Sequence, residues 1–164
     1  MKSLRELFDL ELNYAYDCEQ KLVEKGLPAM IEAATSPQLQ AALKQHLEET
    51  RLHVRRLEQV FGAIGTEPDT KDNEVLNELM NAAEDSVSNI EQSALRDAAL
   101  IVNGNMVEHL EIATYGTLAA FARNLGFQNV VSVLEQTLQE EKTADAKLTQ
   151  LAETMNQQAK RQSA

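Results

Sequence analysis

The sequence predicts an all-α protein built around an antiparallel bundle of four long helices. Glycine and proline are rare, with 6 and 3 copies among 164 residues, and aromatic residues make up only 4% of the chain. Alanine, leucine, glutamate and glutamine, which favour helices, are abundant, whereas residues that favour strands are scarce. Apolar residues also recur at steps of three and four, which is the period of one helix face.

Helix signals divide the chain into five segments. Gly26 and Pro28 predict a kink or a short break inside the first segment. Ser36 and Pro37 start the second, as a capping residue and a proline at the first helical position. Gly126 ends the fourth as a left-handed residue. We expect helices over about residues 3–34, 36–62, 73–87, 93–125 and 129–158.

The lengths of these segments predict the topology. Four of them are near 30 residues, or roughly 45 Å of helix, and such equal amphipathic helices are typical of a four-helix bundle. The short segment at 73–87 follows the clearest loop, at residues 65–69, and lies between the second and third long helices. A long crossover there favours a ferritin-like arrangement. We therefore expect one ferritin-like domain over residues 1–160 and a frayed tail at 161–164.

Charge and composition exclude several classes of function. The chain has 26 acidic and 15 basic residues and a formal charge of −11, whereas binding to nucleic acid or to anionic membranes needs clustered Lys and Arg. No run reaches the ~20 apolar residues of a membrane span, and the N-terminus has no signal-peptide pattern. Cys18 is the single cysteine, which excludes an internal disulfide. We expect a cytoplasmic protein without nucleic-acid or membrane partners.

Acidic and histidine side chains interrupt the apolar faces of the four long segments. A buried ionised carboxylate costs several kcal/mol unless it is paired, and the Lys and Arg residues lie mainly on the outer faces. Two divalent cations would supply the missing charge. Carboxylates and imidazoles without a thiolate cluster favour iron or manganese. The candidate ligands are Glu19, His46, Glu49, Glu108, Glu111, Glu140 and Glu141.

A helical bundle can hold two metal ions with one Glu from each of two helices and a Glu/His pair from each of the others. On this plan Glu19 and Glu111 form the bridging pair. His46 and Glu49, three residues apart, form a paired set of ligands in the order His-x-x-Glu. Glu108 adds an extra carboxylate one turn from Glu111. Each acid taken alone could equally be solvated, so the hypothesis depends on the joint pattern.

Alternatives stay open for several other residues. In the last segment the ligand is Glu140 by alignment with an internal repeat, or Glu141 by its position on the apolar face. Asp145, one turn on, is a further candidate. His53 fits a position at the edge of the core or behind a ligand better than ligation itself. Tyr115, four residues after Glu111, either orients that carboxylate or packs in the core.

Four runs of sequence resemble a known family, the bacterial YciE/YciF stress proteins of the ferritin-like superfamily. The resemblance covers nearly the whole chain. It implies a homodimer with a rubrerythrin-type dinuclear site that includes the seven candidate ligands named above. The runs are His46-Leu47-Glu48-Glu49-Thr50 and residues 96–101 (RDAALI), 107–118 (VEHLEIATYGTL) and 138–142 (LQEEK).

These observations predict a stress-related protein that binds two iron or manganese ions. The expected chemistry is oxidation of Fe(II), or reduction of peroxide, with dioxygen or peroxide as the partner. The alternative function is a helical dimer or adaptor without enzymatic activity, or a stress protein that binds metal passively. The sequence identifies no residue as catalytic.

Overall fold

Helices make up almost all of the computed structural model, which describes residues 1–69 and 71–162. No strand occurs within these residues, so the all-helical prediction is confirmed. The elements are α1 (Leu4–Lys21), the π-helical turn η1 (Leu22–Gly26), α2 (Leu27–Ala33), α3 (Pro37–Ile64), α4 (Glu74–Asn89), α5 (Ala94–Leu125) and α6 (Gln128–Gln162).

Serines and glycines define the helix ends close to where the sequence predicts them. Ser3, Ser36 and Ser93 each accept a hydrogen bond from the backbone N–H three residues later, at the starts of α1, α3 and α5. Gly65 and Gly126 have φ values of 73° and 80° and end α3 and α5. This left-handed conformation favours glycine, which has no Cβ atom.

The irregularity predicted near residues 25–28 is a π-turn, and the chain stays helical through it. The N–H of Leu27 donates to the carbonyl oxygen of Leu22, five residues earlier, which widens this turn. Pro28 follows directly in the first turn of α2, and it has no backbone N–H to donate to the preceding turn. As a result α1, η1 and α2 form one continuous helical segment.

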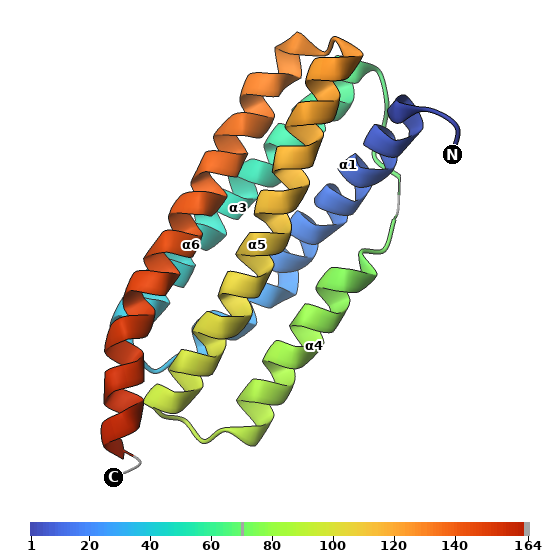
Figure 1. The fold of residues 1–164 in the computed structure, drawn as a ribbon. Helices are drawn as coiled ribbons and strands as arrows, with labels where there is room; N and C mark the ends of the chain where they lie inside the picture. Colours follow the sequence, from blue (N-terminus) through green and yellow to red (C-terminus); the bar gives the residue numbers. More distant parts are fainter. Residues whose placement is uncertain (70, 163–164) are drawn as a thin grey trace.

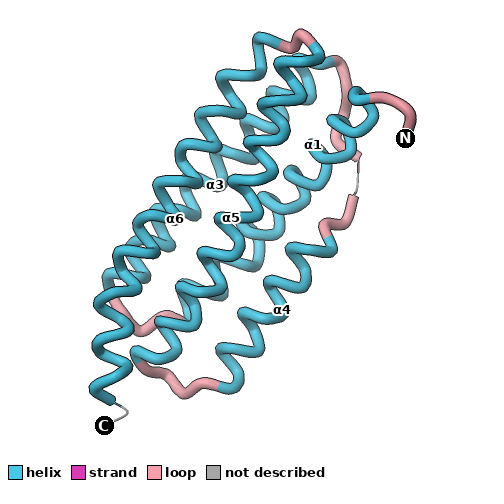
Figure 2. Tube along the Cα trace, viewed as in Figure 1, coloured by secondary structure: helices cyan, strands magenta, loops and turns pink. Residues whose placement is uncertain are grey.

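Four long helical segments lie side by side (Figures 1 and 2). The segment that begins with α1 packs against α3 and α5, and α6 packs against the same two helices. The short helix α4 lies outside them, against α5. Because α4 returns the chain along the length of the molecule, α3 and α5 run in the same direction and α1 and α6 run in the opposite one (Figure 1).

A buried carboxylate fixes the corner between α2 and α3. Asp97, in the first turn of α5, accepts hydrogen bonds from the backbone N–H of Thr35 at 2.7 Å and of Ser36 at 2.8 Å, and from the Thr35 hydroxyl at 2.6 Å. These three donors satisfy a charge that would otherwise be costly to bury. They also hold the start of α3 beside the start of α5. These two helices together provide most of the buried polar residues.

The core contains two separate apolar clusters along the length of the molecule. On α3 the first cluster contains Leu43 and the second contains Leu57, and on α6 they contain Leu148 and Leu134. The turns between these leucines contribute polar side chains to the interior. A polar layer therefore separates two apolar halves of the core.

The last helix is longer than the sequence predicts. Its apolar pattern ends near residue 158 and the tail is predicted to begin at 161, but α6 continues to Gln162. Met155 and Ala159 are still buried, which explains why the helix continues. Residues 163–164, the rest of the predicted tail, lie outside the described residues.

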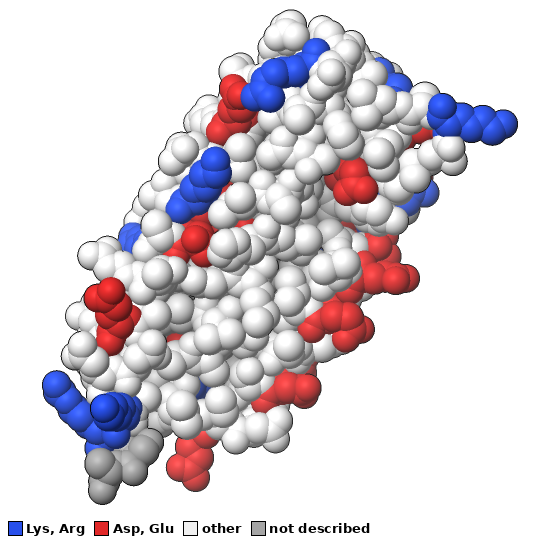
Figure 3. All heavy atoms as spheres, viewed as in Figure 1, with Lys and Arg blue, Asp and Glu red and all other residues white. Residues whose placement is uncertain are grey.

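The surface has an acidic edge and a largely uncharged face. Figure 3 shows acidic side chains along the edge where α4 lies, few charges over the middle of the face where α5 lies, and both acidic and basic side chains along α6. The helix α5 also exposes Leu95, Val102 and Met106. Among the described residues, no helix is both long and apolar enough to cross a membrane.

Candidate metal centre

The polar layer brings together side chains from all four long helical segments. Each of these side chains points inward from the middle of its helix, where the helical period places it among apolar neighbours. All are buried, with exposed fractions between 0% and 7%. They are Glu19 of α1, His46 and His53 of α3, Glu108 and Glu111 of α5, and Glu141 of α6.

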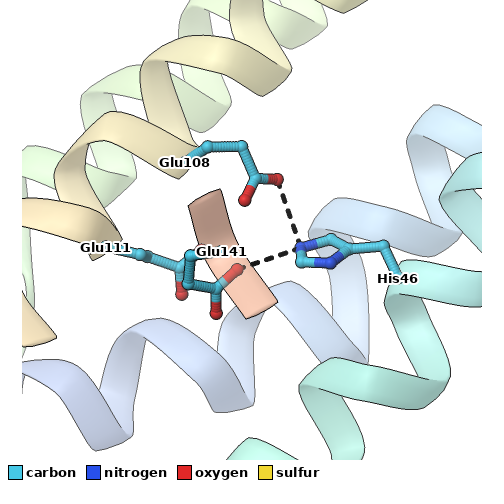
Figure 4. A group of neighbouring side chains, drawn as sticks. All are labelled: His46, Glu108, Glu111 and Glu141. Carbon is cyan, nitrogen blue, oxygen red and sulfur yellow. Dashed lines mark ion pairs between the residues drawn. The ribbon is translucent and has the colours of Figure 1, made fainter. Parts of the chain in front are cut away.

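The first group of possible ligands consists of one imidazole and three carboxylates. One atom from each of His46, Glu108, Glu111 and Glu141 lies within 4.8 Å of the others. Figure 4 shows these side chains converging, with His46 Nε2 3.2 Å from Glu108 Oε1 and 3.8 Å from Glu141 Oε2. This spacing fits the coordination sphere of one cation.

A second group lies beside the first and shares one residue with it. His53 Nδ1 lies 2.8 Å from Glu141 Oε1 and 3.4 Å from Glu19 Oε1, and the three residues also offer ligand atoms within 4.8 Å of one another. Glu141 therefore belongs to both groups. The sequence-based plan instead paired Glu19 with Glu111 as the bridge, but the two residues lie in different groups.

Burial and mutual repulsion shift the pKa values of the carboxyl groups upward. Burial raises the pKa of Glu19, and it raises that of Glu111 well above the ordinary range, with further contributions from neighbouring carboxylates. Burial raises the pKa of Glu108 to about 7, although His46 opposes the shift. The site therefore resists a full set of negative charges when nothing compensates them.

The pKa values of the two imidazoles are raised as well, but for a histidine this shift favours the charged form. Burial alone would lower the pKa of His46, but Glu108 and Glu49 hold its protonated form and raise the pKa well above 6.5. Glu141 and Glu19 likewise overcome burial and raise the pKa of His53 to about 11. Two cationic histidines would offset only part of the negative charge in this layer.

Many polar atoms in the layer have no hydrogen-bond partner. An unsatisfied buried donor or acceptor costs about 1–3 kcal/mol. Several such atoms in one place therefore indicate a missing partner. A cation would accept lone pairs from oxygen and imidazole nitrogen alike. The atoms without a hydrogen bond include Oε2 of Glu19, Glu108, Glu111 and Glu141 and Nδ1 of His46. Nδ1 of His53 and Oε1 of Glu141 contact each other as an ion pair at 2.8 Å.

Glu140 lies outside both groups and contacts the far side of His53. His53 Nε2 lies 2.8 Å from Glu140 Oε2, and Arg56 donates to both oxygens of Glu140 at 2.6 and 3.0 Å. Arg56 and His53 lower the pKa of Glu140 to about 2 despite its partial burial. A carboxylate in this position accepts the Nε2 proton of His53, so Nδ1 is the ring nitrogen that faces Glu19 and Glu141.

The remaining sequence candidates lie at the margin of the site. Glu49 is half-buried, with Oε2 3.7 Å from His46 Nδ1, and its Oε1 accepts a hydrogen bond from Gln45. Asp145 is not in either group and lies 3.4 Å from the exposed His109. Glu49 therefore lies at Nδ1 of His46, whereas Glu108 and Glu141 lie near Nε2, and Asp145 faces another neighbour.

Two uncharged side chains complete the surroundings. Tyr115 donates a hydrogen bond to Glu19 and not, as one sequence alternative held, to Glu111. Cys18 is buried, as predicted for a small apolar residue, and its Sγ lies 3.8 Å from Glu111 Oε1. Burial raises the pKa of both side chains well above the ordinary range, so both keep their protons and act as donors.

Comparison with known proteins identifies the family. Residues 3–160 match the family described as a domain of unknown function, DUF892. The chain is also 36% identical to protein YciF of Escherichia coli K12 over 156 residues, which cover 93% of this chain and 92% of that protein. The chain belongs to the DUF892 family. This result confirms the resemblance to the YciE/YciF stress proteins.

Solved structures share the fold of this DUF892 member. The crystal structure of the E. coli stress protein YciF matches it with a TM-score of 0.92 and 34% identity, covering 96% of this chain and 99% of that chain. A Rhodopseudomonas palustris protein named YcfI matches with a TM-score of 0.88 and 38% identity, covering 91% and 94%. A Xanthomonas campestris protein, at a TM-score of 0.77 and 23% identity, is similar in fold alone.

The raised pKa of Glu108 predicts how the stability of the metal-free protein depends on pH. The folded state holds this proton more tightly than the unfolded state, so the stabilisation is complete below the ordinary pKa of 4.5 and is lost as the pH rises to about 7. With chelator present, the free energy of unfolding of Glu108→Gln, relative to that of the wild type, should therefore increase by on the order of 2–3 kcal/mol from pH 4 to pH 8. Urea unfolding at each pH measures this difference. If this difference in unfolding free energy stays constant or decreases as the pH rises, Glu108 is instead stable as a charged partner of His46.

Proposed function

We propose that this DUF892 protein binds two metal ions, iron or manganese, in its polar layer and uses them in stress-related redox chemistry. The main support is the convergence of four buried carboxylates and two imidazoles whose remaining polar atoms have no partners. Oxygen and imidazole ligands suit iron or manganese, and the single cysteine is placed as a donor to Glu111. The name of the E. coli relative, a stress protein, supports the setting.

The direction of the helices supports a ferritin-like four-helix arrangement. In this chain α3 and α5 are parallel because α4 crosses the length of the molecule between them (Figure 1). Helical bundles with one long crossover and inward carboxylates from all four helices are the usual hosts of dinuclear carboxylate sites. We therefore assign the polar layer to that class of site.

On this proposal each group of side chains holds one ion. His46, Glu108 and Glu111 would bind the first ion, Glu19 and His53 the second, and Glu141 would contact both. Each ion then has carboxylate oxygen and one imidazole nitrogen as donors. Glu49 contacts Nδ1 of His46, the ring nitrogen opposite the one near Glu108, and is placed to orient this histidine.

The ion pair of Glu140 with Arg56 supports ligation by His53. A ligating histidine usually donates its other ring N–H to a carboxylate, which fixes the tautomer and the orientation of the ring. Glu140, held by Arg56, is in the position to accept that proton, so Nδ1 of His53 is free to bind the second ion. Of the two alternatives in α6, we therefore propose that Glu141 binds metal and Glu140 orients His53.

The surrounding side chains suit the site to chemistry with dioxygen or peroxide. When bound, two ferrous or manganous ions would supply the electrons for such a reaction. Tyr115 holds Glu19 in place by a hydrogen bond, and Cys18 donates to Glu111. The carboxylates would stabilise the positive charge of bound ions, and the apolar clusters on either side limit contact with bulk water.

We further propose that the protein is a cytoplasmic homodimer. The resemblance to the YciE/YciF proteins is the basis for both expectations. The exposed Leu95, Val102 and Met106 of α5 are candidates for the contact between two copies, because neighbouring exposed apolar residues often mark an interface.

Metal analysis tests the binding proposal. Protein freed of metal by a chelator should take up two ions of Mn(II), or of Fe(II) without oxygen, per chain, and its melting temperature should rise. Glu141→Gln should abolish at least one ion, because Glu141 belongs to both groups.

The matched control is Glu135→Gln, which removes the same charge from an exposed position of the same helix. It should keep two ions per chain and the thermal response of the wild type. Absence of stoichiometric metal from the wild type, or equal metal content in Glu141→Gln and Glu135→Gln, would contradict the proposal and favour a structural or adaptor function.

Oxidation kinetics separate an enzyme from a passive metal binder. Protein loaded with Fe(II) should consume dioxygen or hydrogen peroxide faster than the same concentration of free Fe(II), and Glu141→Gln should lose this advantage. Oxygen-electrode and peroxide assays measure the two rates. A rate equal to that of free iron would remove the redox proposal and leave metal binding.

A further inference from the structure

An apolar cavity of about 390 Å³ opens beside the polar layer. His46, Glu49 and Glu108 line its polar end, and exposed residues of α3 and α6, among them Gln139 and Lys147, form its rim. The large apolar residues that line it belong to the first core cluster, so the cavity extends from the polar layer into that half of the core. These residues are Leu22, Leu27, Met30, Leu43, Val107 and Leu148.

Two local features of the chain make room for this cavity. Gly104 on α5 lines it, and a Cβ atom there would lie 2.9 Å from Leu148 Cδ1 and 3.5 Å from Met30 Cε. Any larger residue would therefore push these side chains into the cavity. Leu22 is the first residue of the π-turn, and π-turns inside α-helices frequently occur at functional sites.

The walls of the cavity fit an aliphatic chain. They are formed by leucine, valine and methionine, with no aromatic residue among the described residues that line it. A cavity of ~150 Å³ accepts benzene, so this one has room for a chain of about ten carbons. Burial of such a chain against these side chains is favourable because it removes apolar surface from water.

The polar end limits the head group that the chain can bear. Glu49, Glu108 and Glu140 line this end, and the imidazole of His46 already contacts Glu49 and Glu108. An anionic head would therefore be buried there without an unpaired cation. A hydroxyl or hydroperoxide head is uncharged and can exchange hydrogen bonds with the carboxyl groups of Glu49 and Glu108, which line this end. The charge of the site therefore favours a neutral oxygen head over a carboxylate.

We propose that this cavity binds an unbranched aliphatic molecule with an uncharged oxygen head group, such as a long-chain alcohol or an alkyl hydroperoxide. The head lies at His46 and Glu108, and the chain extends between Leu22, Met30 and Leu148. This binding site does not require a bound metal ion. It goes beyond the proposed metal function by defining which organic molecules can reach the polar layer.

Calorimetric titration tests this proposal. The metal-free full chain, in the presence of chelator, is titrated with 1-hexanol, 1-octanol and 1-decanol. We expect one molecule per chain and an affinity that rises on the order of tenfold with every two methylene groups. Decanoate should bind on the order of tenfold or more weakly than 1-decanol because of the surrounding carboxylates. Because no metal is present, the result is independent of the proposed metal function.

A variant with a matched control locates the binding. Gly104→Leu should weaken 1-decanol binding by about tenfold or more, because it fills the cavity. Gly116→Leu adds the same side chain to the same helix at a position where a Cβ meets nothing within 4 Å, and it should bind like the wild type. Circular dichroism confirms that both variants are folded.

Three results would overturn the proposal. These are absence of saturable binding of 1-decanol to the wild type, equal binding by folded Gly104→Leu and Gly116→Leu, and tighter binding of decanoate than of 1-decanol. If Gly104→Leu fails to fold, the chain-length series and the comparison with decanoate still decide the question on the wild type.

Discussion

Four glutamates with almost no solvent exposure share the middle of this helical protein, and only two buried imidazoles face them. Each uncompensated charge costs several kcal/mol in such surroundings. The raised pKa values of Glu19, Glu108 and Glu111 express this cost as a resistance to ionisation. The fold is stable in spite of this layer, because two apolar clusters lie on either side of it. A cost of this size, at one level of all four helical segments, is the basis for the metal proposal.

The residues around the layer restrict how it can be used. Arg56 holds Glu140 beside His53, while Tyr115 donates to Glu19 and Cys18 to Glu111, so three of the buried ligand candidates have a defined orientation. On the other side, the apolar cavity reaches His46 and Glu108. The two histidines of α3 therefore differ in their surroundings, since a carboxylate orients His53 and a cavity borders His46. We infer that two ions bound here would not be equivalent, and that an organic ligand would approach the ion at His46.

Most of the fold follows from local signals in the sequence. Ser36 and Gly65 define α3 and Gly126 ends α5, because capping and left-handed residues act within one turn. The π-turn after Glu19 was predicted only as an irregularity, since the choice between a break and a wide turn depends on packing. The length of α6 was underestimated because burial of Ala159 does not appear in its apolar pattern.

The site was predictable where helical spacing alone decides which side chains face inward. Spacing brings Glu19, His46 and Glu111 to the interior, and position on the apolar face selects Glu141 over Glu140. His53 was ranked behind the other candidate residues, although its seven-residue distance from His46 puts both on one face of α3. The contacts of Arg56 with Glu140 and of Tyr115 with Glu19 join different helices, so only the packed structure could reveal them.

Anomalous X-ray scattering tests most directly whether the polar layer binds two metal ions. The measurement uses crystals of protein loaded with iron or manganese, at the absorption edge of each metal. The account predicts two peaks per chain, one bound by His46 and the other by His53, with Glu141 in contact with both. An interior without a peak, in which His46 and His53 remain paired with carboxylates, would contradict it.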